Sequence, residues 1–350
     1  MISRQLRVAV AAPLSGDDAA WITQHEPRVE LMYEPDLLPP MRWAADYSGD
    51  PEFSRTPEQQ ARFTQLVDGA DALYGIPDVD PSALARVAAA NSRLRWVHTM
   101  AAGGGSQVRG ANLTSEQLER IAFTTSAGVH GHPLAEFAVF GVFAGAKSLA
   151  RLRRQQRDRQ WSGRWSMQQV ADQTVLVLGL GGIGSIVARK LDALGATVVA
   201  VARHDADTAG VSRIVRPEDI VSEAHLMDAV VNTLPGTDAT HHLLGDAFFS
   251  AVKSGATLVN VGRGTVIDEE ALVWALASGQ IGFAALDVFE AEPLPADSPL
   301  WHRDDVLISP HTAALDDREE RRIAELFADN AGRLLDGTPM RNRVNTVEFY

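Results

Sequence analysis

The chain has 350 residues, of which 45% are hydrophobic and 22% charged, with a formal net charge of −13 and no cysteine. This length favours two domains, and the composition excludes collagen-like and disordered chains. The lack of cysteine excludes disulfides, thiolate nucleophiles and cysteine-bound metals, and the acidic balance disfavours nucleic acid as a partner.

Short β-branched runs alternate with helical stretches in the first part of the chain, which predicts a parallel sheet built from βαβ units. Residues 34–53 are rich in proline, aspartate and aromatic residues without a clear period, and we expect a long ordered loop there. The expected strands are Leu6–Ala11, Val29–Tyr33, Asp71–Gly75, Arg95–Thr99 and Ala122–Thr125, and the expected helices are Pro57–Val67 and Pro81–Ala90.

The second part begins after Gly128 with a strongly apolar helix at Pro133–Ala150, followed by seven strands with helices between them. This pattern predicts a doubly wound sheet. The first helix is too apolar for a solvated surface, so we expect it to form the interface of a homodimer. The expected strands are Thr174–Leu178, Thr197–Val201, Ser212–Val215, Ala229–Thr233, Thr257–Val261, Phe283–Asp287 and Val306–Ser309, before a last helix at about Asp316–Leu335.

Two features bear on membrane and nucleic-acid partners. No apolar run reaches the ~18–20 residues of a membrane helix, and Val8–Leu14 is too short for a signal peptide. We therefore expect a cytoplasmic protein with no membrane partner. Six arginines between residues 151 and 164 are interpreted as a solvated helix end, with a nucleic-acid patch as the alternative.

Residues 174–184 read TVLVLGLGGIG and predict a dinucleotide-binding turn. Gly179 allows a tight turn, Gly181 a close approach to a pyrophosphate, and Gly184 close packing of helix on strand. The following helix begins near Gly182 and Ile183, so its first N–H groups and its dipole face the phosphates. A tight turn without a ligand is the alternative.

The residues after the predicted strand Thr197–Val201 indicate whether NAD(H) or NADP(H) binds. An acidic residue there would bind the ribose hydroxyls of NAD(H). The chain has Ala202 at this position and Arg203 after it, which favours the 2′-phosphate of NADP(H). Because Asp205 follows three residues later, NAD(H) stays open as the alternative.

Three further segments follow predicted strands, where ligands bind in open α/β sheets. They carry NVGRGTVIDEEAL from Asn260, ALDVFEAEPLP from Ala285 and ISPHTA from Ile308. Together with LGLGGIG at residue 178 and SAGVHGHPLAE at residue 126, these motifs resemble the D-isomer-specific 2-hydroxyacid dehydrogenase family, which includes glyoxylate/hydroxypyruvate reductases and phosphoglycerate dehydrogenases. The resemblance covers about 125–314 and is loose before that.

Reduction of a 2-oxo acid requires groups that hold a carboxylate, polarise a carbonyl and supply a proton. The guanidinium of Arg263 suits the first two tasks and the imidazole of His311 the third. Glu292 can bind the other ring nitrogen, orient His311 and favour its charged form. The resemblance assigns the same three roles. No metal is expected in this site, and Asp268 with Glu269 is interpreted as a helix N-terminal pair.

The resemblance also implies cofactor contacts from loops after other strands. These residues are Thr233, Leu234, Pro235, Val261, Gly262 and Asp287, the last beside the nicotinamide carboxamide. On the substrate side, Ala102, Gly103 and Gly104 are expected to offer backbone N–H groups to the substrate carboxylate, with residues 74–76 as an opposite wall. His130 and His132 either line the active-site cleft or lie at a hinge.

The sequence thus predicts a two-domain α/β oxidoreductase that transfers a hydride between NADP(H) or NAD(H) and a small 2-oxo or 2-hydroxy acid, with D specificity. Residues 128–314 form a Rossmann cofactor domain, and 1–127 with 315–350 form a flavodoxin-like substrate domain, with the active site in the cleft between them. A dinucleotide-sensing corepressor-like protein without catalysis is the alternative.

Overall fold

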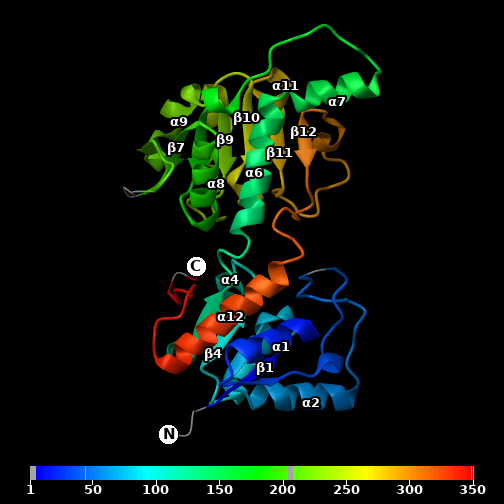
Figure 1. Ribbon diagram of the computed structural model, residues 1–350, viewed down its shortest axis with the longest axis vertical. Helices are drawn as coiled ribbons and strands as arrows, with labels where there is room; N and C mark the ends of the chain where they lie inside the picture. The colour runs from blue at the N-terminus through cyan, green and yellow to red at the C-terminus, as the bar shows by residue number, and fades with distance from the viewer. Residues whose placement is uncertain (1–4, 44, 204–207, 348, 350) are drawn as a thin grey trace. The chain divides into compact units, whose positions relative to one another are not determined.

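The computed structural model describes residues 5–43, 45–203, 208–347 and 349. The chain divides into two compact units, which are described separately. Unit 1 comprises residues 1–130 and 315–350, and unit 2 comprises residues 131–314. Figure 1 shows that each unit contains one sheet flanked by helices.

Unit 1 is built on a five-stranded parallel sheet in the order β2-β1-β3-β4-β5. This order is the flavodoxin-like one, so the predicted class of this part is confirmed. All five predicted strands form, most of them one or two residues shorter than expected. Their bounds are β1 Leu6–Val10, β2 Val29–Met32, β3 Ala72–Tyr74, β4 Trp96–Thr99 and β5 Ala122–Thr125.

Four helices of unit 1, α1, α2, α3 and α5, begin at a residue whose side chain accepts from a free backbone N–H group. Thr56 and Thr114 each form a reciprocal capping box with the glutamine three residues on. Among the described residues of 34–53, the short turn η1, Pro35–Leu37, is the one helical element, in keeping with the aperiodic sequence. The helices are α1 Gly16–His25, α2 Pro57–Asp68, η2 Pro77–Val79, α3 Pro81–Ala90, α4 Gly105–Gly110, α5 Ser115–Arg120 and α12 Glu319–Asp336.

The core of unit 1 contains a histidine. His98 on β4 has no exposed surface, and its Nδ1 and Nε2 lie 2.8 Å from Thr124 Oγ1 and 3.2 Å from Ser126 Oγ. Burial lowers the pKa of His98 to about 3, because desolvation disfavours the charged ring.

We expect this histidine to make unit 1 acid-sensitive. Its pKa in the unfolded chain is ~6.5, so between pH 3 and 6.5 the unfolded state binds the extra proton. The free energy of unfolding should therefore fall by about 2 kcal/mol between pH 7 and pH 5. Urea denaturation at both pH values measures this loss. His98→Gln should remove most of it, whereas His225→Gln at an exposed site should not; an equal loss in His98→Gln would contradict the assignment.

Unit 2 is built on a seven-stranded parallel sheet in the order β12-β11-β10-β9-β6-β7-β8. The order reverses between β6 and β9, as in doubly wound dinucleotide-binding sheets, so the predicted Rossmann class is confirmed. All seven predicted strands form. They are β6 Thr174–Leu178, β7 Thr197–Val201, β8 Arg213–Val215, β9 Ala229–Asn232, β10 Ala256–Asn260, β11 Ile281–Leu286 and β12 Val306–Ile308.

Two separate hydrophobic layers cover the two faces of this sheet. Helices α6, Gly131–Ala146, and α8, Gly182–Ala193, pack against each other and form one layer with strand residues such as Val259. The other layer holds side chains of alternate strand positions, such as Leu258. The remaining helices are α7 Leu149–Arg157, η3 Val170–Asp172, η4 Pro217–Asp219, α9 Ile220–Glu223, η5 Ala224–Leu226, α10 Asp246–Ala251, η6 Gly264–Val266, α11 Glu269–Ser278 and η7 Pro299–His302.

The single apolar helix predicted at 133–150 is wrong in extent. Helix α6 ends at Ala146 and α7 begins at Leu149, with a 67° bend and Ser148 in the left-handed region at φ 54°. The apolar character has a cause within unit 2, since α6 packs on β10 and β11 (Figure 1). Gly141 and Gly145 allow this contact, because a Cβ would lie 2.7 Å from Val259 and 1.9 Å from Thr257.

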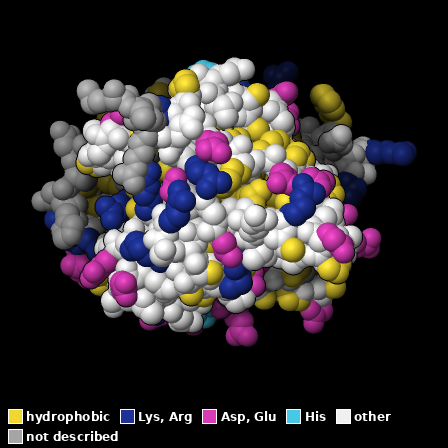
Figure 2. All heavy atoms as spheres, turned by 90° about the horizontal axis from the view of Figure 1, so that it is seen from below, with side chains coloured by type: hydrophobic (Ala, Val, Ile, Leu, Met, Phe, Trp, Pro, Cys, Tyr) yellow, Lys and Arg dark blue, Asp and Glu magenta, His cyan; other side chains and the backbone are white. Residues whose placement is uncertain are grey.

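No single helix in the described ranges is long and apolar enough to cross a membrane; the bent pair α6 and α7 meets the length and composition test only jointly. Four of the six arginines of residues 151–164 lie on α7, where Arg157 pairs with Asp304 at 2.6 Å and Arg151 stacks on Trp165. Elsewhere, Figure 2 shows basic and acidic side chains interspersed over the viewed face.

Candidate active site

The glycine-rich turn after β6 is shaped by two glycines that the chain needs for packing. Gly179 has φ 91°, a conformation that residues with a side chain rarely adopt. A Cβ on Gly184 would lie 1.9 Å from the carbonyl oxygen of Gly179, so only glycine lets α8 approach the turn this closely. Both positions therefore have the roles that the motif predicts.

Gly181 differs from these two, because a Cβ there would meet no protein atom within 4 Å. It is the N-cap of α8, and Gly182 and Ile183 follow in the first turn. The backbone N–H groups of a first helical turn lack intrahelical acceptors and suit an anion. The turn thus offers open space and donors where a pyrophosphate would bind.

A largely apolar cavity of about 480 Å³ adjoins this turn. Gly179, Leu234 and Arg203 all line it, so residues that follow three strands meet there. Pro217 is also part of its wall, and Arg216 donates to the carbonyl oxygen of Ala202 at 3.3 Å. Arg216, a second guanidinium that reaches the end of β7, was not among the predicted residues. Asp205 lies outside the described residues.

Two buried asparagines connect the ends of β9 and β10. Asn232 Nδ2 donates to Asn260 Oδ1 at 2.8 Å, and Asn260 Oδ1 also accepts from Gly262 N at 3.1 Å. Asn232 Oδ1 accepts from Leu234 N at 3.1 Å. The pair therefore fixes the loops that carry Leu234 and Gly262. We did not predict it, although both residues end buried strands and Asn260 begins one of the motifs already quoted.

The loop around Arg263 depends on the glycines that flank it. A Cβ on Gly262 would lie 2.6 Å from the carbonyl oxygen of Leu234, and one on Gly264 would lie 1.9 Å from the backbone of Phe289. Asn260 Nδ2 donates to Arg263 O at 3.2 Å. The backbone of this loop is thus held on both sides, while the Arg263 side chain is exposed.

Glu292 and His311 form a hydrogen-bonded pair. Nδ1 of His311 lies 2.7 Å from Oε2 of Glu292, and Oε1 of Glu292 accepts from Phe289 N at 3.0 Å. With Glu292 ionised, Nδ1 carries the proton of this bond, which leaves Nε2 as the ring nitrogen that can exchange a proton with another molecule. The geometry suits general acid–base chemistry.

Asp287 is buried beneath this pair and organises the loop that carries His311. Its Oδ1 accepts from Ser309 Oγ at 2.6 Å, Thr312 N at 2.9 Å and Ala313 N at 3.0 Å. Its carbonyl oxygen accepts from His311 N at 2.9 Å, and His311 itself has φ 53°. A structural role of Asp287 in holding this loop was not among our predictions.

The other predicted cofactor residues have different surroundings. Thr233 Oγ1 donates to the carbonyl oxygens of Leu178 and Gly179, so its side chain is part of the turn. Pro235 is exposed, and the Val261 side chain lies in the core, which leaves its backbone for any contact with a ligand. Asp268 caps α11 by accepting from Ala271 N at 3.1 Å, as predicted.

Unit 1 has a cavity of about 240 Å³ of its own. Met100 and Ala101 line it, whereas the predicted Ala102, Gly103 and Gly104 do not. A Cβ on Gly104 would lie 1.8 Å from Thr99 Oγ1, so that glycine serves packing.

Two further residues that the sequence singled out belong to unit 1. His130 lies at this cavity, where its Nε2 is 2.8 Å from Oε1 of Glu319. Tyr74 is wrong as a wall residue, because its ring is buried against Phe327; its neighbour Ile76 does line the cavity.

Arg263, Glu292 and His311 thus follow three neighbouring strands, β10, β11 and β12, and are linked through Asn260, Asp287 and the Phe289 backbone. An exposed guanidinium together with an oriented imidazole can bind an anionic carbonyl compound and exchange a proton with it. The glycine turn and the Arg203 cavity lie at the ends of β6 and β7 in the same sheet.

Comparison with known proteins agrees with this arrangement. The family described as "D-isomer specific 2-hydroxyacid dehydrogenase, NAD binding domain" matches residues 139–313. The chain is 32% identical to a glyoxylate reductase of Korarchaeum cryptofilum (strain OPF8) over 233 residues. The matched region covers 64% of this chain and 69% of that protein. It is 37% identical over 185 residues to glyoxylate/hydroxypyruvate reductase B of Enterobacter sp. (strain 638), over 52% of this chain and 56% of that protein.

A solved structure resembles the whole chain. It is a D-isomer specific 2-hydroxyacid dehydrogenase from Xanthobacter autotrophicus Py2 in complex with NADPH and MES. The similarity has a TM-score of 0.78 at 27% identity and covers 99% of this chain and 100% of that one. The likeness therefore extends over both units, including the first, where the sequence motifs were weak.

Proposed function

Since the chain belongs to the D-isomer specific 2-hydroxyacid dehydrogenase family, we propose that it reduces a small 2-oxo acid to the D-2-hydroxy acid with NADP(H) or NAD(H). The observation that carries the proposal is the Glu292–His311 hydrogen bond of 2.7 Å, at the end of the strand next to the one that carries the Arg263 loop. A corepressor-like role without catalysis would not require these groups.

The cofactor would be held by the glycine turn and the adjoining cavity. The N–H groups of Gly182 and Ile183 would bind the pyrophosphate, and Arg203 with Arg216 would bind a 2′-phosphate. When bound, the reduced nicotinamide supplies a hydride to carbon 2 of the acid.

The chain's own residues have three tasks in this reaction. Arg263 binds the substrate carboxylate and polarises the adjacent carbonyl through its fixed planar charge. His311 donates a proton from Nε2 to the carbonyl oxygen as that oxygen gains negative charge. Glu292 holds the ring through Nδ1 and stabilises the charged imidazole that must exist before the proton leaves.

A spectrophotometric screen tests this function. NADPH and NADH oxidation would be followed with glyoxylate, hydroxypyruvate, pyruvate and phenylpyruvate as substrates. We expect oxidation with at least one acid, faster with NADPH, and a D-configured product. Absence of turnover with every acid, together with ligand-dependent partner binding, would favour the corepressor-like alternative.

Cofactor preference should depend on the end of β7. Ala202→Asp combined with Arg203→Ala should reverse the preference toward NADH by about tenfold or more, because a carboxylate repels the 2′-phosphate and binds ribose hydroxyls. The ratio of kcat/KM for NADPH and NADH measures it. Arg189→Ala, on α8, is a matched loss of one arginine and should leave the ratio unchanged. An unchanged ratio in the double variant would refute the role of Arg203.

Three broader expectations are part of the proposal. Residues 128–314 bind the cofactor, while 1–127 with 315–350 bind the substrate. Ala102–Gly104 remain a predicted carboxylate contact. A homodimer and a cytoplasmic location remain predictions; one face of α6 packs within unit 2, while Phe140 on the same helix keeps 47% of its surface exposed.

A further inference from the structure

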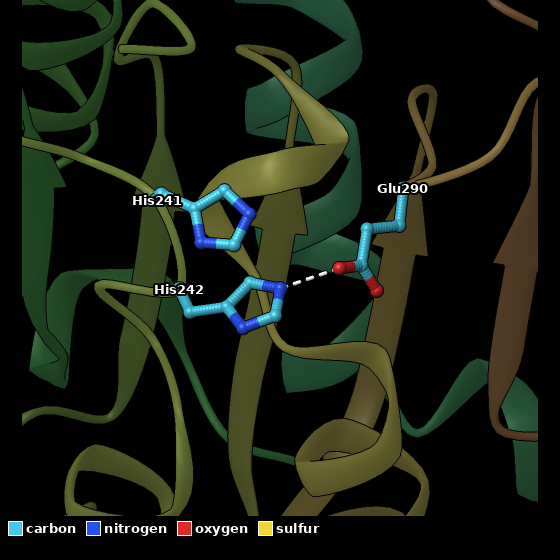
Figure 3. Close-up of side chains that lie close together, drawn as sticks. All are labelled: His241, His242 and Glu290. Atoms are coloured by element: carbon cyan, nitrogen blue, oxygen red, sulfur yellow. Dashed lines mark hydrogen bonds and ion pairs between the residues drawn. The ribbon is translucent and has the colours of Figure 1, made fainter. Parts of the chain in front are cut away.

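A cluster of two histidines and one glutamate lies in unit 2 apart from the groups already discussed. His241, His242 and Glu290 each offer one ligand atom, and these atoms all lie within 4.8 Å of one another. In the described part of the chain, this is the one group of three or more histidine, aspartate or glutamate side chains so arranged. Figure 3 shows both imidazoles on the same side, each with a ring nitrogen facing Glu290.

The backbone holds these three residues in place. His241 N donates to Thr237 O at 3.0 Å and His242 N donates to Thr265 O at 2.9 Å. The two rings stack, with centroids 4.0 Å apart and 28° between their planes. The backbone of His242 is in the left-handed region, with a φ of 50°. Glu290 N donates to Glu269 Oε1 at 2.6 Å. The ligand set is therefore arranged by interactions that do not involve its donor atoms.

The surroundings of His242 match those of a metal-binding histidine. Its Nε2 is hydrogen-bonded to Glu290, and its Nδ1 lies 3.7 Å from Asp268 Oδ2. A histidine that binds a metal through one nitrogen usually faces a carboxylate with the other, which fixes the ring. Asp268 has its own fixed position, because its Oδ1 caps α11. The two nitrogens of the His242 ring thus face two carboxylates, those of Glu290 and Asp268.

From this arrangement we propose that His241, His242 and Glu290 bind a divalent transition-metal ion of the zinc class. Two imidazoles and one carboxylate are a ligand set that zinc accepts, with water in the fourth position. Magnesium and calcium prefer oxygen ligands alone, so they should bind weakly here. On binding, the ion would take the place of the hydrogen between His242 Nε2 and Glu290, and the one N–H of the neutral imidazole would then be at Nδ1, where it faces Asp268.

The proposed ion would join two loops of unit 2. His241 and His242 follow the loop that carries Leu234, and Glu290 precedes Glu292 by two residues. A metal bridge would restrain both loops. The proposal does not rest on the proposed oxidoreductase function, since it concerns binding alone.

The test uses the full, tag-free chain after removal of metals with a chelator. Zn²⁺ would be titrated against a competing chromophoric indicator, with millimolar Mg²⁺ present. We expect one strong site per chain. His241→Ala with His242→Ala should weaken Zn²⁺ binding about 100-fold, and Glu290→Gln about tenfold or more. His225→Ala, which removes an exposed histidine elsewhere in unit 2, should leave the affinity unchanged.

Two outcomes would overturn the proposal. One is a Zn²⁺ affinity that differs by less than about threefold between the wild-type chain and the Glu290→Gln and double-histidine variants. The other is displacement of Zn²⁺ by Mg²⁺. Circular dichroism without metal identifies a misfolded variant, and His241→Ala alone then replaces the double change. Because the readout is binding, failure of this proposal is separate from failure of the catalytic one.

Discussion

Arg263→Ala is expected to reduce kcat/KM for any 2-oxo acid by about 10³-fold, which corresponds to about 4 kcal/mol of transition-state stabilisation. The guanidinium is the group expected to hold the carboxylate and to bind the carbonyl oxygen as charge develops on it. Steady-state kinetics with saturating NADPH measures the loss.

Arg263→Lys separates charge from geometry in the same measurement. Lysine keeps the positive charge but cannot bind a carboxylate with two parallel N–H groups. We expect it to recover only part of the lost activity. Both variants should keep the thermal midpoint of the wild type, because the side chain is exposed and the loop is held by its backbone and by Asn260. Near-normal kcat/KM in Arg263→Ala would remove this residue from the mechanism.

His311→Asn should lower kcat of reduction by about 10²–10⁴-fold, because the proton donor is lost. Glu292→Gln should lower kcat less than His311→Asn does, because the amide can still bind Nδ1 although the negative charge is lost. The amide holds the ring less firmly than a carboxylate does, so kcat should fall by about tenfold while KM for the acid stays near the wild-type value.

A double-mutant cycle distinguishes this role from a structural one. A glutamate that acts through the imidazole should cause no further loss of kcat once His311→Asn is present, whereas one that only held the loop would lower kcat and the thermal midpoint in either background. Glu290→Gln is a matched control, because it removes a neighbouring exposed carboxylate that does not contact His311. Equal losses of kcat from Glu292→Gln in the wild-type and His311→Asn backgrounds would contradict the assigned role.

The parallel sheets were predictable because their strands are short β-branched runs that recur at the spacing of βαβ units. All twelve predicted strands form, and Asp268 caps α11 as predicted. The break at Ser148 was not predictable in the same way. Only Lys147 and Ser148 interrupt the apolar run there, and a left-handed φ is uncommon for a serine.

The sequence predicted Arg263, Glu292 and His311 as the groups of the site. It did not predict most of the hydrogen bonds that hold their loops in place. Asn232 and Asn260 pair across two strands, and Asp287 binds a loop more than twenty residues further along the chain. Such contacts depend on strand order, which local sequence does not specify. For the same reason, the proximity of Glu290 to His242 was not predicted. An asparagine at the end of an apolar strand is the one feature of the sequence that could have indicated such a hydrogen bond.

The strand order of unit 2 also separates two properties that could be changed independently by protein engineering. The residues proposed to bind the adenosine phosphate follow β6, β7 and β8, while the proposed reacting groups follow β10, β11 and β12. Strand β9 lies between the two sets. Redesign for a cheaper electron donor can therefore be confined to one half of the sheet, with the chemistry of the other half left as it is.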